Sequence, residues 1–320
     1  MLHFGRYLLT KRRRPTPYSP GPGTAPMFAL LANLAAILAP VMLISGVGFV
    51  WVKRGNAFDQ GFATQLIAVL SAPCLVFSTL VQMHVSAGEF SSIGAAAFIC
   101  LCVSGMIGAA ALWALRLPVK VFVASLTFPN IGNMGLPVCL FAFGERGVAL
   151  AMIYFTVVSI FQFTLGPMLA SGKFQPALLF KTPFVYAAVA ALVVVLLHLS
   201  VPQWIVNTTS VLGQIAVPLM LLALGVALAQ LRIANLGRAL VVSLLRLGIG
   251  LACGWAVAQG MGFHGAARGV VIIESAMPAA VFNYLFALIY DNSPEEVAGV
   301  IMVSTLLSYL TLPFLVAALI

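Results

Sequence analysis

Charged side chains are scarce in this sequence. Of its 320 residues 7% are charged and 62% are hydrophobic, whereas ordinary soluble domains carry roughly a quarter charged residues. This shortage excludes a soluble enzyme, a nucleic-acid-binding protein and a disordered chain. It predicts a protein that crosses a membrane, because one spanning helix needs about 20 mostly apolar residues. Membrane lipid is therefore an expected partner, and nucleic acid is not.

Patterns for metal, redox and nucleotide chemistry are also missing. The five cysteines lie inside apolar runs, without a CxxC pair or a zinc-like spacing, so we interpret them as small buried hydrophobic residues. No glycine-rich GxxxxGK[ST] loop is present, which disfavours ATP-driven transport. We expect neither a metal site nor a bound cofactor.

Much of the basic charge belongs to the first 26 residues. Five of the 16 basic residues lie in residues 1–26, which are otherwise rich in proline and glycine. Such a segment cannot bury apolar surface, so we expect a disordered tail. A signal peptide is not favoured, because no small-residue cleavage site follows. The tail is either a basic arm beside the membrane or an upstream artefact, with translation starting at Met27.

Ten apolar runs follow the tail, separated by short polar breaks. They predict an all-α membrane protein with about ten transmembrane helices. The runs cover about residues 28–52, 60–83, 92–115, 119–143, 147–170, 178–199, 204–230, 237–259, 267–290 and 296–319.

Basic residues gather in alternate loops. One set of loops carries eight, and the other carries only Arg146 and Arg268. Because basic short loops stay in the cytoplasm, both termini should lie on the non-cytoplasmic side of a cell membrane, such as a bacterial inner membrane. The basic tail opposes this orientation, unless Met27 is the true start, the loops outweigh the tail or the helix count is odd. The eight residues are Lys53, Arg54, Arg116, Lys120, Lys173, Lys181, Arg232 and Arg238.

Prolines punctuate the two halves of the chain at similar intervals, offset by 143 to 149 residues. We therefore predict two repeats, residues 27–172 and 173–320. Five helices in each half is an odd number, so the second repeat would be inverted, as in many secondary transporters. Chance is the alternative, since membrane helices are enriched in proline. The prolines are Pro40, Pro73, Pro129 and Pro167, then Pro183, Pro218, Pro278 and Pro313.

The fourth apolar run is interrupted by a cluster of helix-breaking and polar residues. Proline removes backbone hydrogen bonds and glycine lets the backbone open, which at membrane depth is tolerated inside protein or beside a watery cavity. A half-helix beginning there would direct its first N–H groups into the cavity and favour an anion. A kinked packing helix is the alternative. The cluster consists of Pro129, Asn130, Gly132, Asn133, Gly135 and Pro137.

The ninth run contains a weaker break, with Pro278 and the polar Asn283. Two charges fall inside predicted spans, Arg246 in the eighth and Glu274 in the ninth, and such residues are usually functional or paired. Glu274 could carry a proton, and Arg246 could attract an anion or hold Glu274 in place. Alternatively, the two form a structural ion pair or extend to the membrane interfaces.

At these residues the chain resembles the auxin efflux carrier family, which includes bacterial malonate-permease-like members and the plant PIN-FORMED carriers. The family pattern L-P-N-x-x-x-x-G-x-P is matched at Pro129, Asn130, Gly135 and Pro137, with Phe128 in place of leucine. The resemblance covers about residues 28–320.

This resemblance implies a five-plus-five inverted-repeat carrier of the bile-acid/sodium symporter superfamily. Helices four and nine would cross at Pro129 and Pro278 beside the substrate, with Asn130 facing it. Helices one, two, six and seven would form a scaffold that often makes a homodimer. The residue after the second crossing proline is polar in plant members but is Ala279 here, so the plant substrate is not expected.

The sequence thus predicts a secondary active transporter for a small organic anion, with Asn130, Asn133, Asn283 and Arg246 binding the substrate. Coupling would be to a proton, which Glu274 favours, or to sodium. A channel or transporter-like receptor is the alternative. An intramembrane enzyme is disfavoured, because no aspartate lies within a span and no histidine is placed beside a serine at depth.

Overall fold

The computed structural model describes residues 26–82, 86–172, 183–197, 199–230 and 234–320. All regular structure in these residues is helical, and a single isolated bridge is the only β-type pairing. The expected all-α class is confirmed to this extent. The tail of residues 1–26 lies outside the described residues, except for its last residue.

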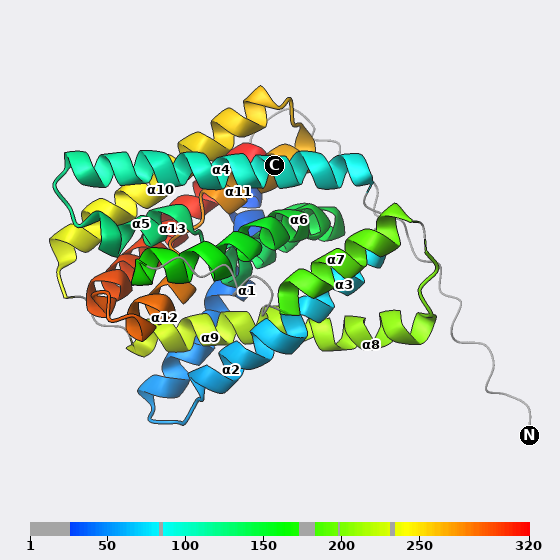
Figure 1. The fold of residues 1–320 in the computed structure, drawn as a ribbon, viewed down its shortest axis with the longest axis horizontal. Helices are drawn as coiled ribbons and strands as arrows, with labels where there is room; N and C mark the ends of the chain where they lie inside the picture. The colour runs from blue at the N-terminus through cyan, green and yellow to red at the C-terminus, as the bar shows by residue number, and fades with distance from the viewer. Residues whose placement is uncertain (1–25, 83–85, 173–182, 198, 231–233) are drawn as a thin grey trace, which may run out of the picture.

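Helices occur in each of the ten apolar runs (Figure 1). In chain order they are α1 (Pro26–Lys53), α2 (Gln60–Leu66), η1 (Ile67–Ser71), α3 (Ala72–Gln82), α4 (Ala87–Ala114), α5 (Val119–Thr127), η2 (Ile131–Gly135), α6 (Leu136–Ser171), α7 (Pro183–Leu196), α8 (Gln203–Gln214), α9 (Ala216–Gln230), α10 (Leu236–Gly260), α11 (Gly265–Ser275), α12 (Phe282–Ile289) and α13 (Pro294–Leu319). The two η elements are π-helical turns.

Six stretches of the described chain are long and apolar enough to cross a membrane. The protein is therefore a multi-pass membrane protein by helix composition. Outside these stretches, α5, α7, α11 and α12 are shorter, with 9, 14, 11 and 8 residues. The six stretches are Gln60–Thr79, Gly88–Ala114, Ile131–Ser171, Gln203–Gln230, Leu236–Gly260 and Pro294–Leu319.

The stretch Ile131–Ser171 has 41 residues, about twice the length that a bilayer core requires. It is divided at Gly144, whose φ of 64° and ψ of −155° are not helical. A Cβ on Gly147 would collide with the carbonyl oxygen of Cys139, eight residues earlier. Such proximity is impossible in a straight helix, so the chain reverses direction at Gly144.

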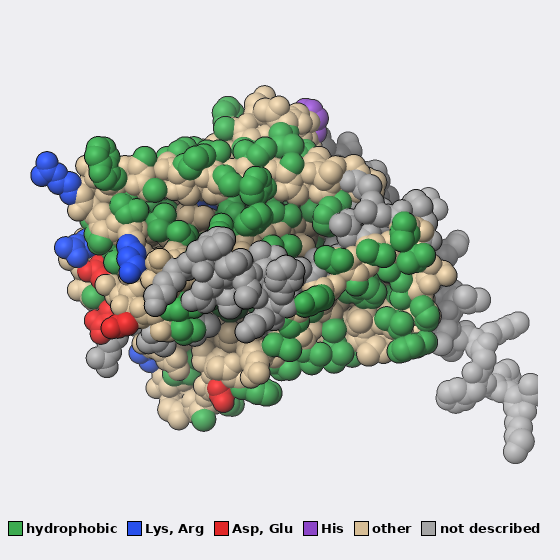
Figure 2. Space-filling model, viewed as in Figure 1, with side chains coloured by type: hydrophobic (Ala, Val, Ile, Leu, Met, Phe, Trp, Pro, Cys, Tyr) green, Lys and Arg blue, Asp and Glu red, His purple; other side chains and the backbone are tan. Residues whose placement is uncertain are grey.

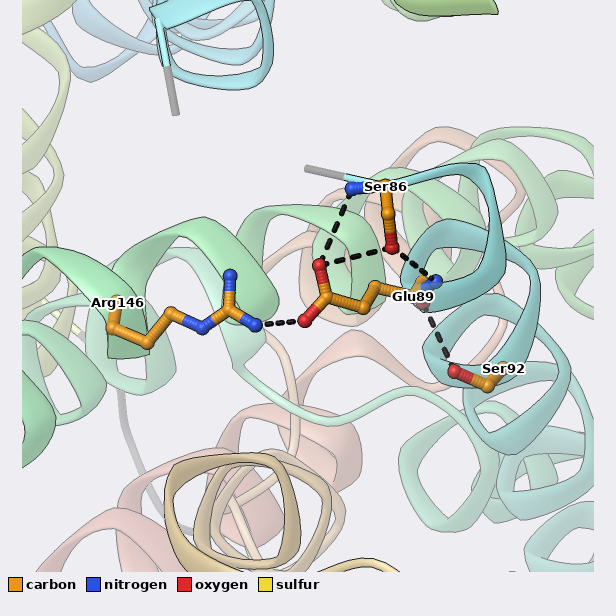
Figure 3. Close-up of polar contacts among 4 residues, drawn as sticks. All are labelled: Ser86, Glu89, Ser92 and Arg146. Atoms are coloured by element: carbon orange, nitrogen blue, oxygen red, sulfur yellow. Dashed lines mark hydrogen bonds and ion pairs between the residues drawn. The ribbon is translucent and has the colours of Figure 1, made fainter. Parts of the chain in front are cut away.

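A polar cluster ties the start of α4 to this reversal (Figure 3). The Ser86 side chain accepts a hydrogen bond from the Glu89 N–H, and the Glu89 carboxylate accepts one from the Ser86 N–H, which forms a capping box. The other oxygen of that carboxylate pairs with Arg146, two residues after Gly144. The ion pair therefore joins two connections at the same end of the molecule.

The helices pack in two groups (Figure 1). In one group α1 lies against α9, and α3 lies against α7 and α8. In the other, α10 contacts α4, α11 and α13, while α6 contacts α4 and α11. The groups meet where α6 and η2 contact α1, α3 and α9.

Hydrophobic side chains cover much of the face in Figure 2, and most of the charged ones gather at its left end. The charged connections at one end are also in contact: Arg238 pairs with Glu296 at 3.0 Å, and Asn292 donates to the Lys120 carbonyl at 3.0 Å. An apolar belt with charges at its end is the surface that a bilayer requires.

Helices α1 and α9 pack backbone to backbone through two glycines. A Cβ on Gly225 would collide with the Ser45 carbonyl, and one on Gly48 with the Leu222 carbonyl. Small residues allow such close approach between membrane helices, where packing rather than hydrophobic burial drives association.

We therefore expect Gly225→Ala to lower the free energy of unfolding by about 1–3 kcal/mol, because neither backbone can move aside cheaply. Thermal unfolding of the purified protein in detergent measures this effect. Gly46→Ala in α1 is the control, since a Cβ there meets nothing within 4 Å. Equal melting temperatures for the two variants would contradict this account of the packing.

Candidate functional site

The two interrupted segments meet in the interior and complete each other's backbone hydrogen bonds. Pro129 and Ala279 form an antiparallel bridge. The Asn130 N–H donates to the Pro278 carbonyl at 2.7 Å, and the Ala280 N–H donates to the Phe128 carbonyl at 3.0 Å. Unwound backbone is thereby satisfied by protein, as it must be at membrane depth.

Asn283 supports this junction from the second segment. It is buried, and its Nδ2 donates to the carbonyls of Ala124 and Phe128, both at 3.3 Å. Its Oδ1 is buried without a hydrogen-bond partner. The side chain predicted to bind substrate thus holds the end of α5, with one oxygen atom unused.

A cavity lies on one side of the junction, at the start of η2. Its walls come from both helix groups, since η1, α3 and α9 contribute as well as the two interrupted segments and α6. Phe163 and Phe282 pack edge to face in its wall, with ring centroids 4.9 Å apart. The lining residues are Ile67, Ala72, Pro129, Asn130, Ile131, Gly132, Asn133, Phe155, Ser159, Gln162, Phe163, Met220, Ala280 and Phe282.

Three buried polar groups of this lining have no hydrogen-bond partner. They are the Nδ2 of Asn130, the Nε2 of Gln162 and the Oγ of Ser159. A buried polar group left unpaired costs about 1–3 kcal/mol, so three around one cavity indicate a place for a polar ligand. None of the lining side chains is charged. The first N–H groups of η2 also lack intrahelical partners and form the positive end of a helix dipole.

The structure therefore brings Asn130 and Asn133 to the cavity, together with Gly132 of the predicted break. Gly135 and Pro137 are buried further along the chain. Sequence reasoning did not identify Ser159 and Gln162 as site residues, because they lie in the uncharged apolar run 147–170 and its proline, Pro167, follows them. The only signal was the presence of a glutamine amid apolar residues.

Glu274 lies beside the same break but does not line the cavity. Its side chain is fully buried, and its Oε1 accepts a hydrogen bond from the Cys139 Sγ at 3.6 Å, while Oε2 has no partner. A Cβ on Gly135 would lie 2.7 Å from the Glu274 carboxyl carbon. The carboxyl group thus occupies the space that the missing side chain of Gly135 leaves open.

Arg246 also lies away from the cavity, with 1% of its surface exposed. Its guanidinium group donates to the carbonyls of Leu126, Ser275 and Met277. The ion pairs among the described residues are Arg146–Glu89 and Arg238–Glu296, so the suggested Arg246–Glu274 pair is not formed. Both residues are buried, so they do not extend to the membrane interfaces either.

Comparison with known proteins identifies the family of this chain. A family model described as membrane transport protein matches residues 35–175 and 167–316. The chain therefore belongs to the membrane transport protein family, the family of the auxin efflux carriers. This is a family of transporters and not of enzymes.

Two archaeal relatives carry the same general description. The chain is 27% identical to an "uncharacterized transporter" of Methanothermobacter thermautotrophicus over 298 residues, which cover 88% of this chain and 97% of the relative. It is 24% identical to another "uncharacterized transporter", from Methanocaldococcus jannaschii, over 194 residues, which cover 57% of this chain and 63% of the relative.

The contact between Gly135 and Glu274 generates a prediction about stability. Gly135→Ala should lower the free energy of unfolding by about 1–3 kcal/mol, because the new methyl group overlaps the carboxyl group. Most of this loss should disappear in a Glu274→Ala background, where the space is vacant.

A double-mutant cycle of thermal unfolding in detergent measures this coupling. Gly94→Ala is the control, since its Cβ would make an ordinary contact with Val157 at 3.5 Å. Purely additive effects of the two substitutions would show that the two residues do not share this space.

Proposed function

We propose that the protein is a secondary active transporter, a permease or efflux carrier, for a small organic anion such as a carboxylate. One observation carries the proposal: a cavity at the meeting point of two broken helices is lined by three buried polar groups that lack partners. Two of them, the Asn130 and Gln162 amide nitrogens, are donors only. Carboxylate oxygens are acceptors, so they complement these groups.

The dipole of η2 and α6 supplies the remaining attraction for an anion. Their first N–H groups begin beside Asn130 and Asn133, and a helix N-terminus favours negative charge. In this proposal Asn130, Asn133, Ser159 and Gln162 contact the substrate. Asn283 and Arg246 position the backbone around it.

The ten apolar runs are proposed to be ten spans in two inverted repeats, residues 27–172 and 173–320. Each span of the first repeat can be exchanged with its counterpart in the second, the first with the sixth, the second with the seventh, and so on. Under this exchange one observed helix contact corresponds to another. Thus α1 against α9 becomes α7 against α3, and α4 against α5 becomes α10 against α11. The segments α5–η2–α6 and α11–α12 then correspond as the broken fourth and ninth spans.

Alternating access is proposed to come from movement of one helix group against the other. The cavity lies between the groups: Ile67, Ala72 and Met220 belong to the group of α1, α3 and α9, and the other lining residues to the second group. Rocking of one group would expose the cavity to opposite sides in turn. The first group corresponds to the scaffold through which a homodimer is proposed to form.

The protein is proposed to lie in a cell membrane, such as a bacterial inner membrane, with both chain ends on the non-cytoplasmic side. Contacts between loops support the expected assignment of alternate loops to opposite sides of the membrane. Lys120 and Asn292 are joined at one end, where Arg238 and Glu296 also pair, and Glu89 joins Arg146 in the other set.

The test is uptake and efflux in proteoliposomes against a panel of mono- and dicarboxylates, with and without a pH gradient. We expect saturable movement of at least one anion and accumulation above equilibrium when a gradient is imposed. Movement that never exceeds equilibrium would favour a channel. Binding without movement would favour a transporter-like receptor.

The cavity donors predict which substitutions weaken substrate binding. Gln162→Met and Ser159→Ala should each raise KM for the transported anion about tenfold or more, because a hydrogen bond to a charged group contributes about 1.5–3 kcal/mol.

Initial uptake rates over a range of anion concentrations measure this effect. Ser125→Ala is a matched control, since Ser125 is also a buried serine whose Oγ has no partner but does not line the cavity. If the Ser125 variant were impaired as much as the Ser159 variant, the cavity would not be the binding site.

Proton coupling is proposed to depend on Glu274, the only acidic side chain buried among the described residues. Glu274→Gln keeps the shape but cannot release a proton. We expect it to allow exchange of anion down a gradient while abolishing accumulation driven by a pH gradient, measured in the same vesicles. Undiminished accumulation would remove Glu274 as the coupling group.

A further inference from the structure

The Arg246 side chain lies between the carbonyl ends of two half-helices. α5 ends at Thr127 and α11 at Ser275, where each chain enters its break. The guanidinium Nη1 donates to the Leu126 carbonyl at 2.6 Å, and Nη2 donates to the Ser275 carbonyl. Both acceptors belong to last turns, whose carbonyls lack intrahelical partners and form the negative end of a helix dipole.

A third carbonyl comes from the unwound backbone. The Nε of Arg246 donates to the Met277 carbonyl at 3.1 Å, just before Pro278. One buried cation thus faces two half-helix ends and one unwound peptide. In inverted-repeat carriers such groups often coordinate the coupling cation.

Helix α10 is shaped to admit this side chain. Arg246, Gly250 and Gly254 follow at intervals of four residues and share one face of the helix. A Cβ on Gly250 would collide with the Ser275 carbonyl and lie 2.9 Å from the Arg246 Nη2, and one on Gly254 would lie 2.7 Å from the Ser275 Cβ. The two glycines therefore let the end of α11 approach Arg246.

We propose that Arg246 is a built-in cation that takes the place of a metal ion at the junction of the two broken helices. It is a positioning residue: it neutralises the two half-helix ends and holds both breaks together without touching the substrate cavity. The inference rests on the proposed transport function in one respect. It implies that transport needs no sodium ion at this position, so that Glu274 remains the coupling group.

The test uses the purified full-length protein in detergent and measures melting temperature in sodium chloride and in choline chloride of equal ionic strength. The wild type should melt at the same temperature in both salts. Arg246→Ala should melt roughly 10 °C lower, because buried acceptors and two helix ends lose their cation. Guanidinium at low millimolar concentration should restore part of this loss in Arg246→Ala and should not raise the melting temperature of the wild type.

Two further variants separate charge from packing and keep the test decisive if Arg246→Ala does not fold. Arg246→Lys keeps a cation, whereas Arg246→Gln keeps donors without charge, so the lysine variant should be the more stable of the two. Gly248→Ala is the control on the same helix, because a Cβ there meets nothing within 4 Å.

Three results would overturn the proposal: saturable stabilisation of the wild type by sodium, a glutamine variant as stable as wild type, or an alanine variant that no cation stabilises. These measurements need no transported substrate. Failure to find a transported anion would therefore count against the proposed function and leave this inference to its own test.

Discussion

The interior of this protein depends on backbone hydrogen bonding between two stretches of unwound chain. Prolines at 129 and 278 cannot donate, and each follows the end of a helix at membrane depth, where freed peptide groups need partners within the protein. The two stretches satisfy each other, through Asn130 to Pro278 and Ala280 to Phe128. The irregular backbone is tolerated because both breaks lie at the same place.

Polar side chains outside the cavity lining also bind this junction. Asn283 binds the carbonyls of Ala124 and Phe128, and Ser304 accepts from the Ala279 N–H at 3.2 Å. Arg246 binds three more carbonyls near the ends of α5 and α11. Side chains outside the cavity lining therefore donate hydrogen bonds to the backbone carbonyls around the junction. The unpaired groups of Asn130, Ser159 and Gln162 line the cavity, and the proposed preference for an acceptor-rich ligand rests on them.

Much of the architecture could be predicted from the sequence, because lipid imposes simple requirements. Apolar runs of about 20 residues marked the helices, and the proline and glycine cluster at 129–137 marked the first break. Glu274 and Arg246 could be singled out because they are charges within apolar runs. Their relationship did not follow, because adjacent predicted spans suggest an ion pair, whereas Ser275 faces Arg246 and its neighbour Glu274 faces Gly135 and Cys139.

By itself the sequence determined the class, a multi-pass helical membrane transporter with breaks near Pro129 and Pro278, since scarcity of charge and loss of backbone donors are local properties of the chain. Tertiary structure alone decided how polar groups were shared between the junction and the cavity. Ser159 and Gln162 line the cavity, whereas Asn283 and Arg246 bind backbone carbonyls. The role of a buried polar side chain depends on the partners that distant helices bring to it. Those partners are separated by up to 159 residues in the chain, a distance over which no local pattern carries information.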